Sequence, residues 1–384
     1  MKLRRIDDLP PYVFATVDQL KRELRREGHD VIDLGFGNPD IASPAVAVEK
    51  LREAAAKPAN HRYSASRGIP QLRAAVCELY ARRFGVALDP ETQVVSTIGA
   101  KEGLAHLMWV LLEPGDTAVV PAPSYPIHLV APRLPGGTVV TAPVSEGIDG
   151  VVEAAAASRA RVVVVSYPHN PTTATVSEEE LQRLVDAARE HEFLVVHDFA
   201  YADIAFDGHR PASVLAADGA LECAVELYSL TKSFSMAGWR VGFLLGRPDV
   251  VQALAKLKSY LDYGTFQPIQ IASIVALREA QDAPEEICAQ YLSRRDALCG
   301  GLARAGWPVS PPRGTMFLWA PIPERHRQLG SLEFSLLLAR SAHVAVSPGI
   351  GFGAGGDGHV RFALVENEQR IVQATRAIRR LLET

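Results

Sequence analysis

The sequence predicts an α/β fold in which helices sandwich a mostly parallel central sheet, together with a smaller α+β domain. Between about residues 90 and 245, short apolar runs alternate with helical patterns, which is typical of a parallel sheet with helices on both faces. The chain has 384 residues, of which 48% are hydrophobic and 22% are charged. This length and composition suit about two domains and a large buried core.

Six of the apolar runs are predicted as strands of the central sheet. They cover residues 93–97, 117–121, 161–166, 192–197, 224–230 and 241–245. One helix between them is predicted over residues 101–112 and ends before Pro114. Another covers residues 177–191, where Ser177 and Glu180 form a capping box. The large domain therefore occupies the middle of the sequence.

A second group of elements follows Pro284. Helices are predicted over residues 285–305 and 367–382, with strands over 315–320, 344–347 and 359–363 between them. The break in composition near Pro284 predicts a domain boundary. We therefore expect a large domain of residues 45–283 and a small domain that joins residues 1–44 to residues 284–384.

The charge balance and the N-terminus argue against several classes of partner. With 40 basic and 44 acidic residues, the net charge is -4, so we expect neither nucleic acid nor an anionic membrane as the main partner. Residues 1–20 mix charges with prolines and contain no apolar run long enough for a signal peptide or a membrane span. The sequence therefore predicts a cytoplasmic protein.

The cysteines and histidines lack the spacings of a disulfide framework or a metal centre. Cys77, Cys223, Cys288 and Cys299 form no Cys-x-x-Cys pair, which predicts buried free thiols. His-Glu-x-x-His and zinc-like Cys/His spacings are absent. No metal site is therefore predicted.

Lys232 is the residue from which we expect covalent chemistry. It follows the predicted strand 224–230 and lies among hydroxyl-bearing and small residues, at the carboxyl edge where open α/β sheets bind ligands. An amine among anion-binding groups suits a covalent bond to a phosphorylated carbonyl cofactor, with Ser229, Ser233 or Arg240 on the phosphate. A solvated surface lysine is the alternative.

Three other strand ends carry polar or aromatic groups. Residues Gly99 to Lys101 lead from a strand into a helix, so their backbone donors suit a phosphate, with a simple helix cap as the alternative. Tyr125 suits stacking on a flat ring, although it equally suits packing in a proline-rich loop. Asn170 suits a hydrogen bond to a ring hydroxyl, and a turn-forming Asn before Pro is the alternative.

Asp198 ends a very apolar run, where a buried carboxylate is costly without a cationic partner. A protonated pyridine nitrogen is such a partner and keeps the ring an electron sink, whereas a structural salt bridge is the competing explanation. Tyr201, three residues further on, suits a bond to the ring oxygen. Arg361 lies in a predicted strand and suits bidentate capture of a carboxylate, unless it faces outward as a surface residue.

Two competing motifs fail on their context. Residues 351–356 match Gly-x-Gly-x-x-Gly, but a strand follows them where a dinucleotide site needs a helix, so we interpret them as a loop near the site. His197, Asp198 and Ser229 suggest a hydrolase triad. However, neighbours on a strand point to opposite faces, and no Gly-x-Ser-x-Gly elbow occurs.

Taken in this order, the segments resemble the class I and II aminotransferases, which are pyridoxal 5'-phosphate (PLP) enzymes of fold type I. The resemblance covers nearly the whole chain, from Leu9 to Arg361. It implies amino-acid and 2-oxo-acid substrates and a homodimer with shared active sites. It implies three catalytic residues, Lys232, Asp198 and Tyr201. Lys232 bonds the cofactor and then moves the proton, and Asp198 pairs with the pyridine nitrogen.

The resemblance also implies the contacts of cofactor and substrate. Around the phosphate it places Gly99, Ala100, Lys101, Ser229, Arg240 and, from the other subunit, Tyr63. On the ring it places Tyr125 by stacking and Asn170 with Tyr201 by hydrogen bonds to the ring oxygen. For the substrate it implies Arg361, Asn170, Gly37 and Tyr12. Many relatives read Asn-Pro-Thr-Gly where this chain has Thr173, a departure that leaves Asn170 in place.

The segments 124–128, 196–203 and 347–353 are most similar to bacterial glutamate-pyruvate (alanine) aminotransferases. We therefore expect ping-pong transfer between alanine or glutamate and pyruvate or 2-oxoglutarate. The alternatives are an LL-diaminopimelate or aspartate aminotransferase, a PLP-dependent cysteine-conjugate β-lyase, and a non-catalytic sensor. A sensor usually needs a fused DNA-binding segment, for which we expect no room before Leu9. Arg67 and Arg313 are candidates, by position only, for binding a distal carboxylate.

Overall fold

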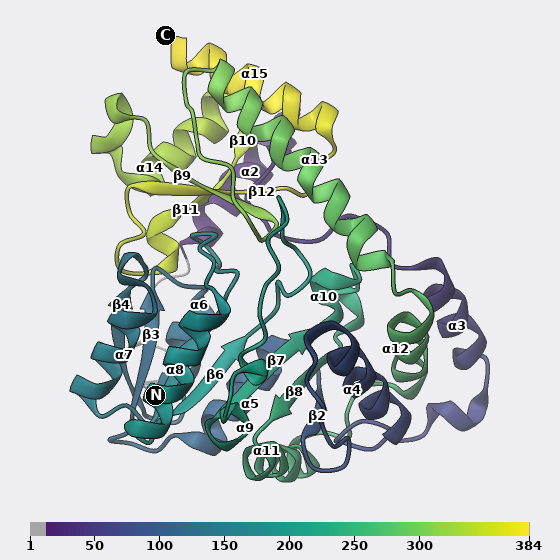
Figure 1. The fold of residues 1–384 in the computed structure, drawn as a ribbon. Coiled ribbons are helices and arrows are strands. Elements are labelled where there is room, and N and C mark those ends of the chain that lie inside the picture. The colour runs from purple at the N-terminus through teal and green to yellow at the C-terminus, as the bar shows by residue number, and fades with distance from the viewer. Residues whose placement is uncertain (1–12, 384) are drawn as a thin grey trace, which may run out of the picture.

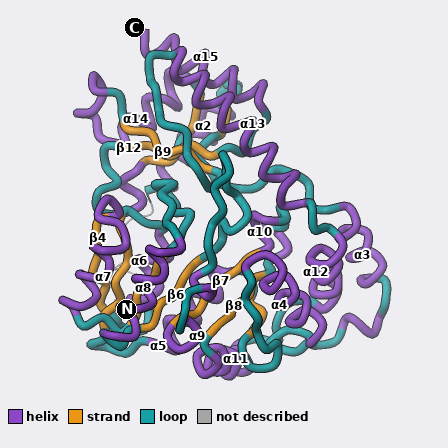
Figure 2. The backbone as a smooth tube through the Cα atoms, viewed as in Figure 1, coloured by secondary structure: helices purple, strands orange, loops and turns teal. Residues whose placement is uncertain are grey.

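The computed structural model describes residues 13–383 and contains a large central sheet with helices around it and a smaller sheet at one side (Figure 1). Figure 2 separates the strands of the two sheets from the helices that cover them. Tyr12, a predicted substrate contact, lies outside the described residues.

The central sheet has seven strands in the order β2-β8-β7-β6-β5-β3-β4. Strand β8 is antiparallel to both neighbours and the other pairs are parallel, which confirms the mostly parallel sheet. The strands are β2 (Val94–Thr97), β3 (Thr117–Ala122), β4 (Thr138–Pro143), β5 (Val162–Val165), β6 (Leu194–Asp198), β7 (Ala224–Ser229) and β8 (Gly242–Gly246).

Two differences from the predicted strands have a physical cause. Strand β4 was missed because it is a half-exposed edge strand, so its sequence lacks a sustained apolar run. Strand β6 begins at Leu194 because Glu192 has a left-handed backbone, with φ of 57°, a conformation that ends extended structure.

Alternate residues of the strands point into two separate cores, one on each face of the sheet. Val163 and Val165 of β5 pack with α4, α7 and α8, whereas Val162 and Val164 pack with α5 and α11. This arrangement confirms the helices on both faces. Their bounds are α4 (Pro70–Phe84), α5 (Ala100–Leu111), α7 (Gly147–Ser158), α8 (Glu178–Glu190) and α11 (Pro248–Leu261).

The predicted capping box is present at the start of α8. Ser177 Oγ accepts from the backbone N–H of Glu180 at 3.2 Å, and Glu180 Oε2 accepts from Ser177 N–H at 2.8 Å. The remaining α-helices of residues 45–282 are α3 (Ala45–Ala55), α6 (Pro126–Val130), α9 (Ala220–Cys223), α10 (Leu230–Ser233) and α12 (Gln267–Glu279).

The smaller sheet is antiparallel, in the order β11-β12-β9, and packs with three helices around another core. These strands are β9 (Phe317–Pro321), β11 (Ser347–Pro348) and β12 (His359–Ala363). The helices are α13 (Ala283–Arg304), α14 (Gly330–Leu337) and α15 (Glu368–Glu383). The predicted strand 344–347 is divided into β10 (Val344–Ala345) and β11, because its two halves pair with different strands.

The N-terminal segment lies against this smaller body. Strand β1 (Ile32–Asp33) pairs with β10, and helix α2 (Phe14–Arg26) buries Val17 and Leu24 against Leu336 and Ala339. The division into residues 45–283 and residues 1–44 with 284–384 stays a prediction. Among the described residues, no helix combines the length and apolar character that a membrane crossing requires.

Candidate active site

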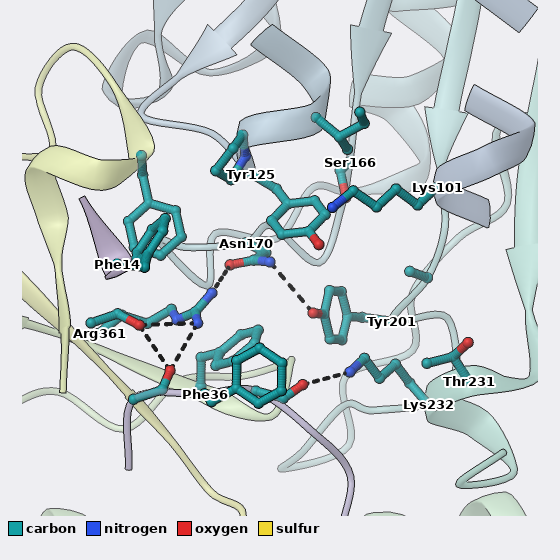
Figure 3. Close-up of a pocket in the computed structure, with 18 of the residues that line it drawn as sticks. Phe14, Phe36, Lys101, Tyr125, Ser166, Asn170, Tyr201, Thr231, Lys232 and Arg361 are labelled. Carbon is teal, nitrogen blue, oxygen red and sulfur yellow. Dashed lines mark hydrogen bonds between the residues drawn. The ribbon is translucent and has the colours of Figure 1, made fainter. Parts of the chain in front are cut away.

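A cavity of about 270 Å³ lies where the carboxyl ends of β6 and β7 face the small sheet, and it gathers most of the predicted site residues. Figure 3 shows the side chains that point into the same space, among them Lys101, Tyr125, Asn170, Tyr201, Lys232 and Arg361. The predicted residues that line it are Gly37, Ala100, Lys101, Tyr125, Asn170, Asp198, Tyr201, Ser229, Lys232, Arg240 and Arg361.

Lys232 lies on the short helix α10, directly after β7. Ser229 begins this helix, since its hydroxyl accepts from the backbone N–H of Thr231 at 3.2 Å. The Lys232 amine is buried and donates to the backbone oxygen of Gly37 at 2.9 Å. Burial, and then the charges of Arg361 and Arg240, lower the pKa of Lys232 to about 7. The solvated-lysine alternative is therefore wrong, and the amine is available as a nucleophile near neutral pH.

This pKa gives an expected labelling profile for the cofactor-free protein. An amine reacts only when it is neutral, so acetylation of Lys232 by acetic anhydride should rise as the pH rises through about 7 and then level off. Mass spectrometry of the peptide measures it, with the exposed Lys256 as internal reference. A midpoint near the ordinary value of 10.5 would contradict the assignment.

Asp198 has one satisfied and one unsatisfied carboxylate oxygen. Its Oδ2 is 2.8 Å from His128 Nε2, and His128 Nδ1 is 3.0 Å from Ser124 Oγ. Its Oδ1 is buried, with no hydrogen-bond partner among the described residues. A buried acceptor of this kind is costly unless a donor reaches it. The protonated nitrogen of a pyridine ring in the cavity supplies such a donor, so PLP fits this part of the site.

The start of α5 and Arg240 form an anion-binding corner. Gly99 precedes the helix with φ of 78°, and a Cβ atom there would collide with the guanidinium of Arg240. Arg240 donates to the backbone oxygens of Ala237 at 3.2 Å and Ile98 at 3.3 Å. The backbone N–H groups at a helix start and a nearby guanidinium suit a phosphate. Lys101 adds a second cation, 5.6 Å from the ring centre of Tyr125.

A hydrogen-bonded row of Arg361, Asn170 and Tyr201 forms the opposite side. Arg361 donates to Asn170 Oδ1 at 2.8 Å, and Asn170 Nδ2 donates to the Tyr201 hydroxyl at 3.5 Å. The Arg361 guanidinium is buried and lies 3.9 Å from the ring centre of Phe317, so the outward-facing alternative is wrong. Burial raises the pKa of Tyr201 above its ordinary value, which keeps its hydroxyl protonated as a donor.

Some predicted residues do not line the cavity of this chain. Gly99 lies behind Ala100, against Arg240. Tyr63 is 85% exposed and packs on Tyr263. Arg67 and Arg313, the positional candidates for a distal carboxylate, are absent from the cavity lining.

The structure adds residues for which the sequence offered little signal. His128 contacts Asp198 from 70 positions away, and Ser166 donates its hydroxyl to the backbone oxygen of Asp198 at 2.8 Å. Ser124 precedes α6 and His128 lies on it, so the helical i, i+4 rule does not predict their contact, and nothing in the sequence pairs His128 with Asp198. Lys21 of α2 also lines the cavity. It does not follow a strand of the central sheet, so the argument from strand ends did not select it.

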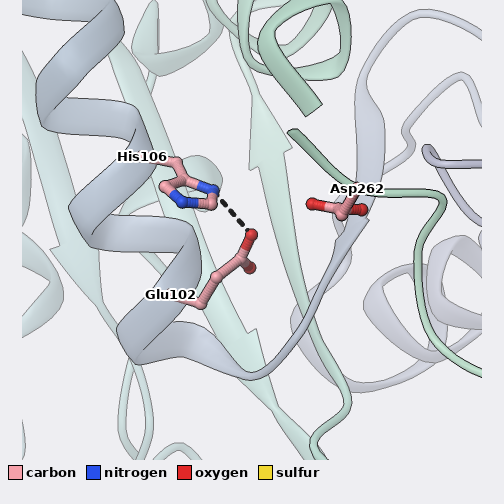
Figure 4. A group of neighbouring side chains, drawn as sticks. All are labelled: Glu102, His106 and Asp262. Carbon is pink, nitrogen blue, oxygen red and sulfur yellow. Dashed lines mark ion pairs between the residues drawn. The ribbon is translucent and has the colours of Figure 1, made fainter. Parts of the chain in front are cut away.

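Glu102, His106 and Asp262 form a cluster of side chains that could bind a metal ion, and Glu102 lies in the first turn of α5 (Figure 4). Glu102 is 2.7 Å from His106 Nδ1, and its other oxygen accepts from Ile98 N–H at 2.7 Å. The fully buried ammonium of Lys258 donates to Glu102 at 3.0 Å and to Asp262 at 2.9 Å. Because Lys258 supplies the cation, we interpret the cluster as a support for the loop before α5.

The chain is similar to known proteins over nearly its whole length. A family model described as aminotransferase class I and II matches residues 29–378. A glutamate-pyruvate aminotransferase, AlaC, of Escherichia coli K12 is 49% identical over 98% of this chain and 93% of that protein. An LL-diaminopimelate aminotransferase of Desulforudis audaxviator is 42% identical over 99% of this chain and 97% of that protein.

Solved structures agree with these relatives. Substrate-bound BacF from Bacillus subtilis superposes with a TM-score of 0.92 at 34% identity, covering 99% of this chain and 98% of that one. A double mutant of Thermus thermophilus aspartate aminotransferase superposes with a TM-score of 0.90 at 28% identity, covering 99% of both chains.

Proposed function

Since this chain belongs to the class I and II aminotransferases, which are PLP-dependent, we propose that it moves an amino group between alanine or glutamate and pyruvate or 2-oxoglutarate by a ping-pong mechanism. The observation that supports this proposal most is the meeting of Lys232, the unsatisfied oxygen of Asp198 and Arg361 in one cavity. The 49% identity to a glutamate-pyruvate aminotransferase supports the choice of substrates.

In this mechanism Arg361 binds the α-carboxylate of the amino acid through its planar guanidinium. Asn170 and the ring of Phe317 hold the guanidinium in place, which orients the α-carbon. Lys232 would take the α-proton on its amine nitrogen and would then give it to the cofactor rather than back to the α-carbon, since its lowered pKa suits both steps near neutral pH.

When bound, PLP supplies an electron sink for the negative charge that develops at the α-carbon. Asp198 would keep the proton on the ring nitrogen, and the His128 contact orients its carboxylate. Tyr201 and Asn170 would supply hydrogen-bond donors to the ring oxygen, and Tyr125, which also lines the cavity, would stack on the ring. The residues that would hold the phosphate are Arg240, Ser229, Lys101 and, through their N–H groups, Gly99 and Ala100.

A panel of donors and acceptors tests the substrates. The holoenzyme is assayed with alanine, glutamate, aspartate and LL-diaminopimelate against pyruvate, oxaloacetate and 2-oxoglutarate. We expect the highest kcat/KM for alanine with 2-oxoglutarate and for glutamate with pyruvate. A preference for LL-diaminopimelate, the donor named for several relatives, or for aspartate would replace this proposal. Release of pyruvate and ammonia from a cysteine conjugate without an acceptor would identify a β-lyase.

The proposed working form is a homodimer in which Tyr63 reaches the phosphate of the other subunit. Tyr63 packs on Tyr263, both rings are exposed, and the exposed Tyr260 and Phe266 lie within three residues of Tyr263 in the sequence. Exposed patches of this kind mark protein interfaces, and a second copy is the partner that would bring Tyr63 to a cavity. A cytoplasmic location also stays a prediction.

Mixed dimers test the shared site. Lys232→Ala and Tyr63→Ala chains are each expected to have impaired sites. After dissociation and random re-pairing of equal amounts, about a quarter of the sites would combine an intact Lys232 with an intact Tyr63. Activity should therefore exceed that of either variant alone. No gain over the sum of the two parents would show that each site is built from one chain.

A further inference from the structure

Within one chain, most of the Tyr63 side chain faces solvent, although the proposed dimer requires it at the phosphate of the other subunit. Tyr63 is 85% exposed, and its ring centre lies 4.6 Å from that of Tyr263. A side chain that is ordered only on binding costs free energy, and prior ordering of its backbone lowers that cost. The groups that hold the backbone around Tyr63 therefore bear on the active site of the other subunit.

Two loops carry this aromatic pair, and they lie against each other. We call residues 63–69 the Tyr63 loop and residues 262–266 the Tyr263 loop. A Cβ atom on Gly264 would lie only 2.8 Å from the backbone oxygen of Ala65, and Gly264 has a left-handed backbone with φ of 74°. The close approach of the loops therefore requires glycine at this position.

Gln270 holds both loops from a buried position on α12. Its Nε2 donates to Ser64 Oγ at 2.9 Å and to the backbone oxygen of Thr265 at 2.7 Å. Its Oε1 accepts from the backbone N–H of Ile69 at 2.9 Å. Because a carbonyl oxygen only accepts and an N–H only donates, these partners determine which end of the amide faces each loop. Gln270 is 1% exposed, so its hydrogen bonds are shielded from water.

The elements on which these loops rest are themselves well anchored. Helix α12 buries Ala276 and Leu277 in the core that α3 and α4 also line. In the Tyr263 loop, Asp262 Oδ1 accepts from the backbone N–H of Gly264 at 2.6 Å, and Asp262 Oδ2 accepts from Lys258 at 2.9 Å. Gln270 therefore connects the Tyr63 loop to a packed helix and to a loop that has an anchor of its own.

We propose that Gln270 is a positioning residue for the active site of the other subunit, because it keeps the Tyr63 loop ordered for the contact of Tyr63 with the phosphate there. Gln270 does not line the cavity of its own chain, so its effect passes across the dimer. The inference rests on the proposed function, since it requires a shared site. Loss of Gln270 should weaken cofactor binding in the other subunit and leave its own site nearly unchanged.

Mixed dimers with a single intact Lys232 separate these two directions. One chain carries Lys232→Ala, so borohydride attaches cofactor only to Lys232 of the other chain. Gln270→Met keeps an unbranched side chain but forms none of the three hydrogen bonds. It is placed either in the Lys232→Ala chain or in the chain with the intact Lys232. Two affinity tags isolate each mixed dimer, and mass spectrometry follows the fraction of Lys232 that can still be labelled after free cofactor is removed.

We expect the intact site to lose cofactor about 10-fold faster when Gln270→Met lies in the Lys232→Ala chain, because Tyr63 is then no longer ordered. When Gln270→Met lies in the chain with the intact Lys232, the rate should stay near that of the control. The matched control is Gln281→Met, since Gln281 is exposed beyond the end of α12 and donates to the nearby backbone oxygen of Arg278.

Tyr63→Phe in the Lys232→Ala chain is the reference for the shared site itself. If it does not speed the loss of cofactor, the shared site of the proposed function is contradicted and the role of Gln270 falls with it. Faster loss with Tyr63→Phe but not with Gln270→Met, or equal effects of Gln270→Met in either chain, would overturn the role of Gln270 alone.

Ser64→Ala decides the question if Gln270→Met does not fold. It removes one hydrogen bond of Gln270 to the Tyr63 loop, so cofactor loss should be about threefold faster, and only when Ser64→Ala lies in the Lys232→Ala chain. An unchanged rate in that arrangement would overturn the inference.

Discussion

Replacement of Lys232 by alanine is expected to lower the rate of transamination by at least ~10⁴-fold, because it removes both the nucleophile and the proton carrier. The amine is buried, its pKa is lowered to about 7, and it lies at the end of β7 in the cavity that Arg361 also lines. Among the described lysines that line this cavity, Lys21 is fully paired and Lys101 lies beside Tyr125. Neither is positioned to substitute for Lys232.

Single-turnover kinetics with alanine or glutamate measure the loss of rate in this variant. Reduction of the wild-type holoenzyme with borohydride should attach the cofactor permanently to the peptide that contains Lys232, and the variant should lack this adduct. Lys101→Ala is a useful comparison, since it removes a cavity-lining lysine from the anion-binding corner. It should weaken cofactor binding while leaving the covalent adduct. Near-native turnover by Lys232→Ala would show that another group carries the chemistry.

The positions of Lys232 and Asp198 could be predicted from the sequence because each directly follows or ends an apolar strand. Parallel strands bring their carboxyl ends to one edge of a sheet, so the order of elements predicted that these residues would meet. The hydroxyl groups and the glycine near residues 97–101 and 229–240 also follow strands, and they predicted the phosphate-binding part of the site. The family resemblance then supplied roles that spacing alone left open.

Contacts between distant segments could not be predicted in this way. His128 reaches Asp198 from helix α6, and Lys21 reaches Asp33 from α2. Such contacts depend on how elements pack in three dimensions, and one sequence contains no local pattern for them. For the same reason Arg67 and Arg313 were chosen only by position. Edge strand β4 was missed because exposure weakens its apolar pattern.

Asp198→Ala is expected to have the next largest effect, a fall in kcat/KM of about 10³-fold. The variant loses the only carboxylate whose unsatisfied oxygen lines the described part of the cavity. The ring nitrogen then loses its proton, so the electron sink weakens. Lys232 and the anion-binding corner stay intact, and the cofactor content should remain near that of the wild type when measured after denaturation.

A pH profile separates this electrostatic role from a structural one. If Asp198 acts by keeping the ring nitrogen protonated, the rate of Asp198→Ala relative to that of the wild type at the same pH should rise as the pH falls, because protons from solution then restore the charge. Asp198→Glu should recover part of the activity, whereas Asp198→Asn should not. His128→Ala keeps the carboxylate and loses one hydrogen bond to it, so a fall of only ~10-fold is expected. Equal losses in His128→Ala and Asp198→Ala, with no gain at low pH, would mean that Asp198 serves only to hold the fold of the site.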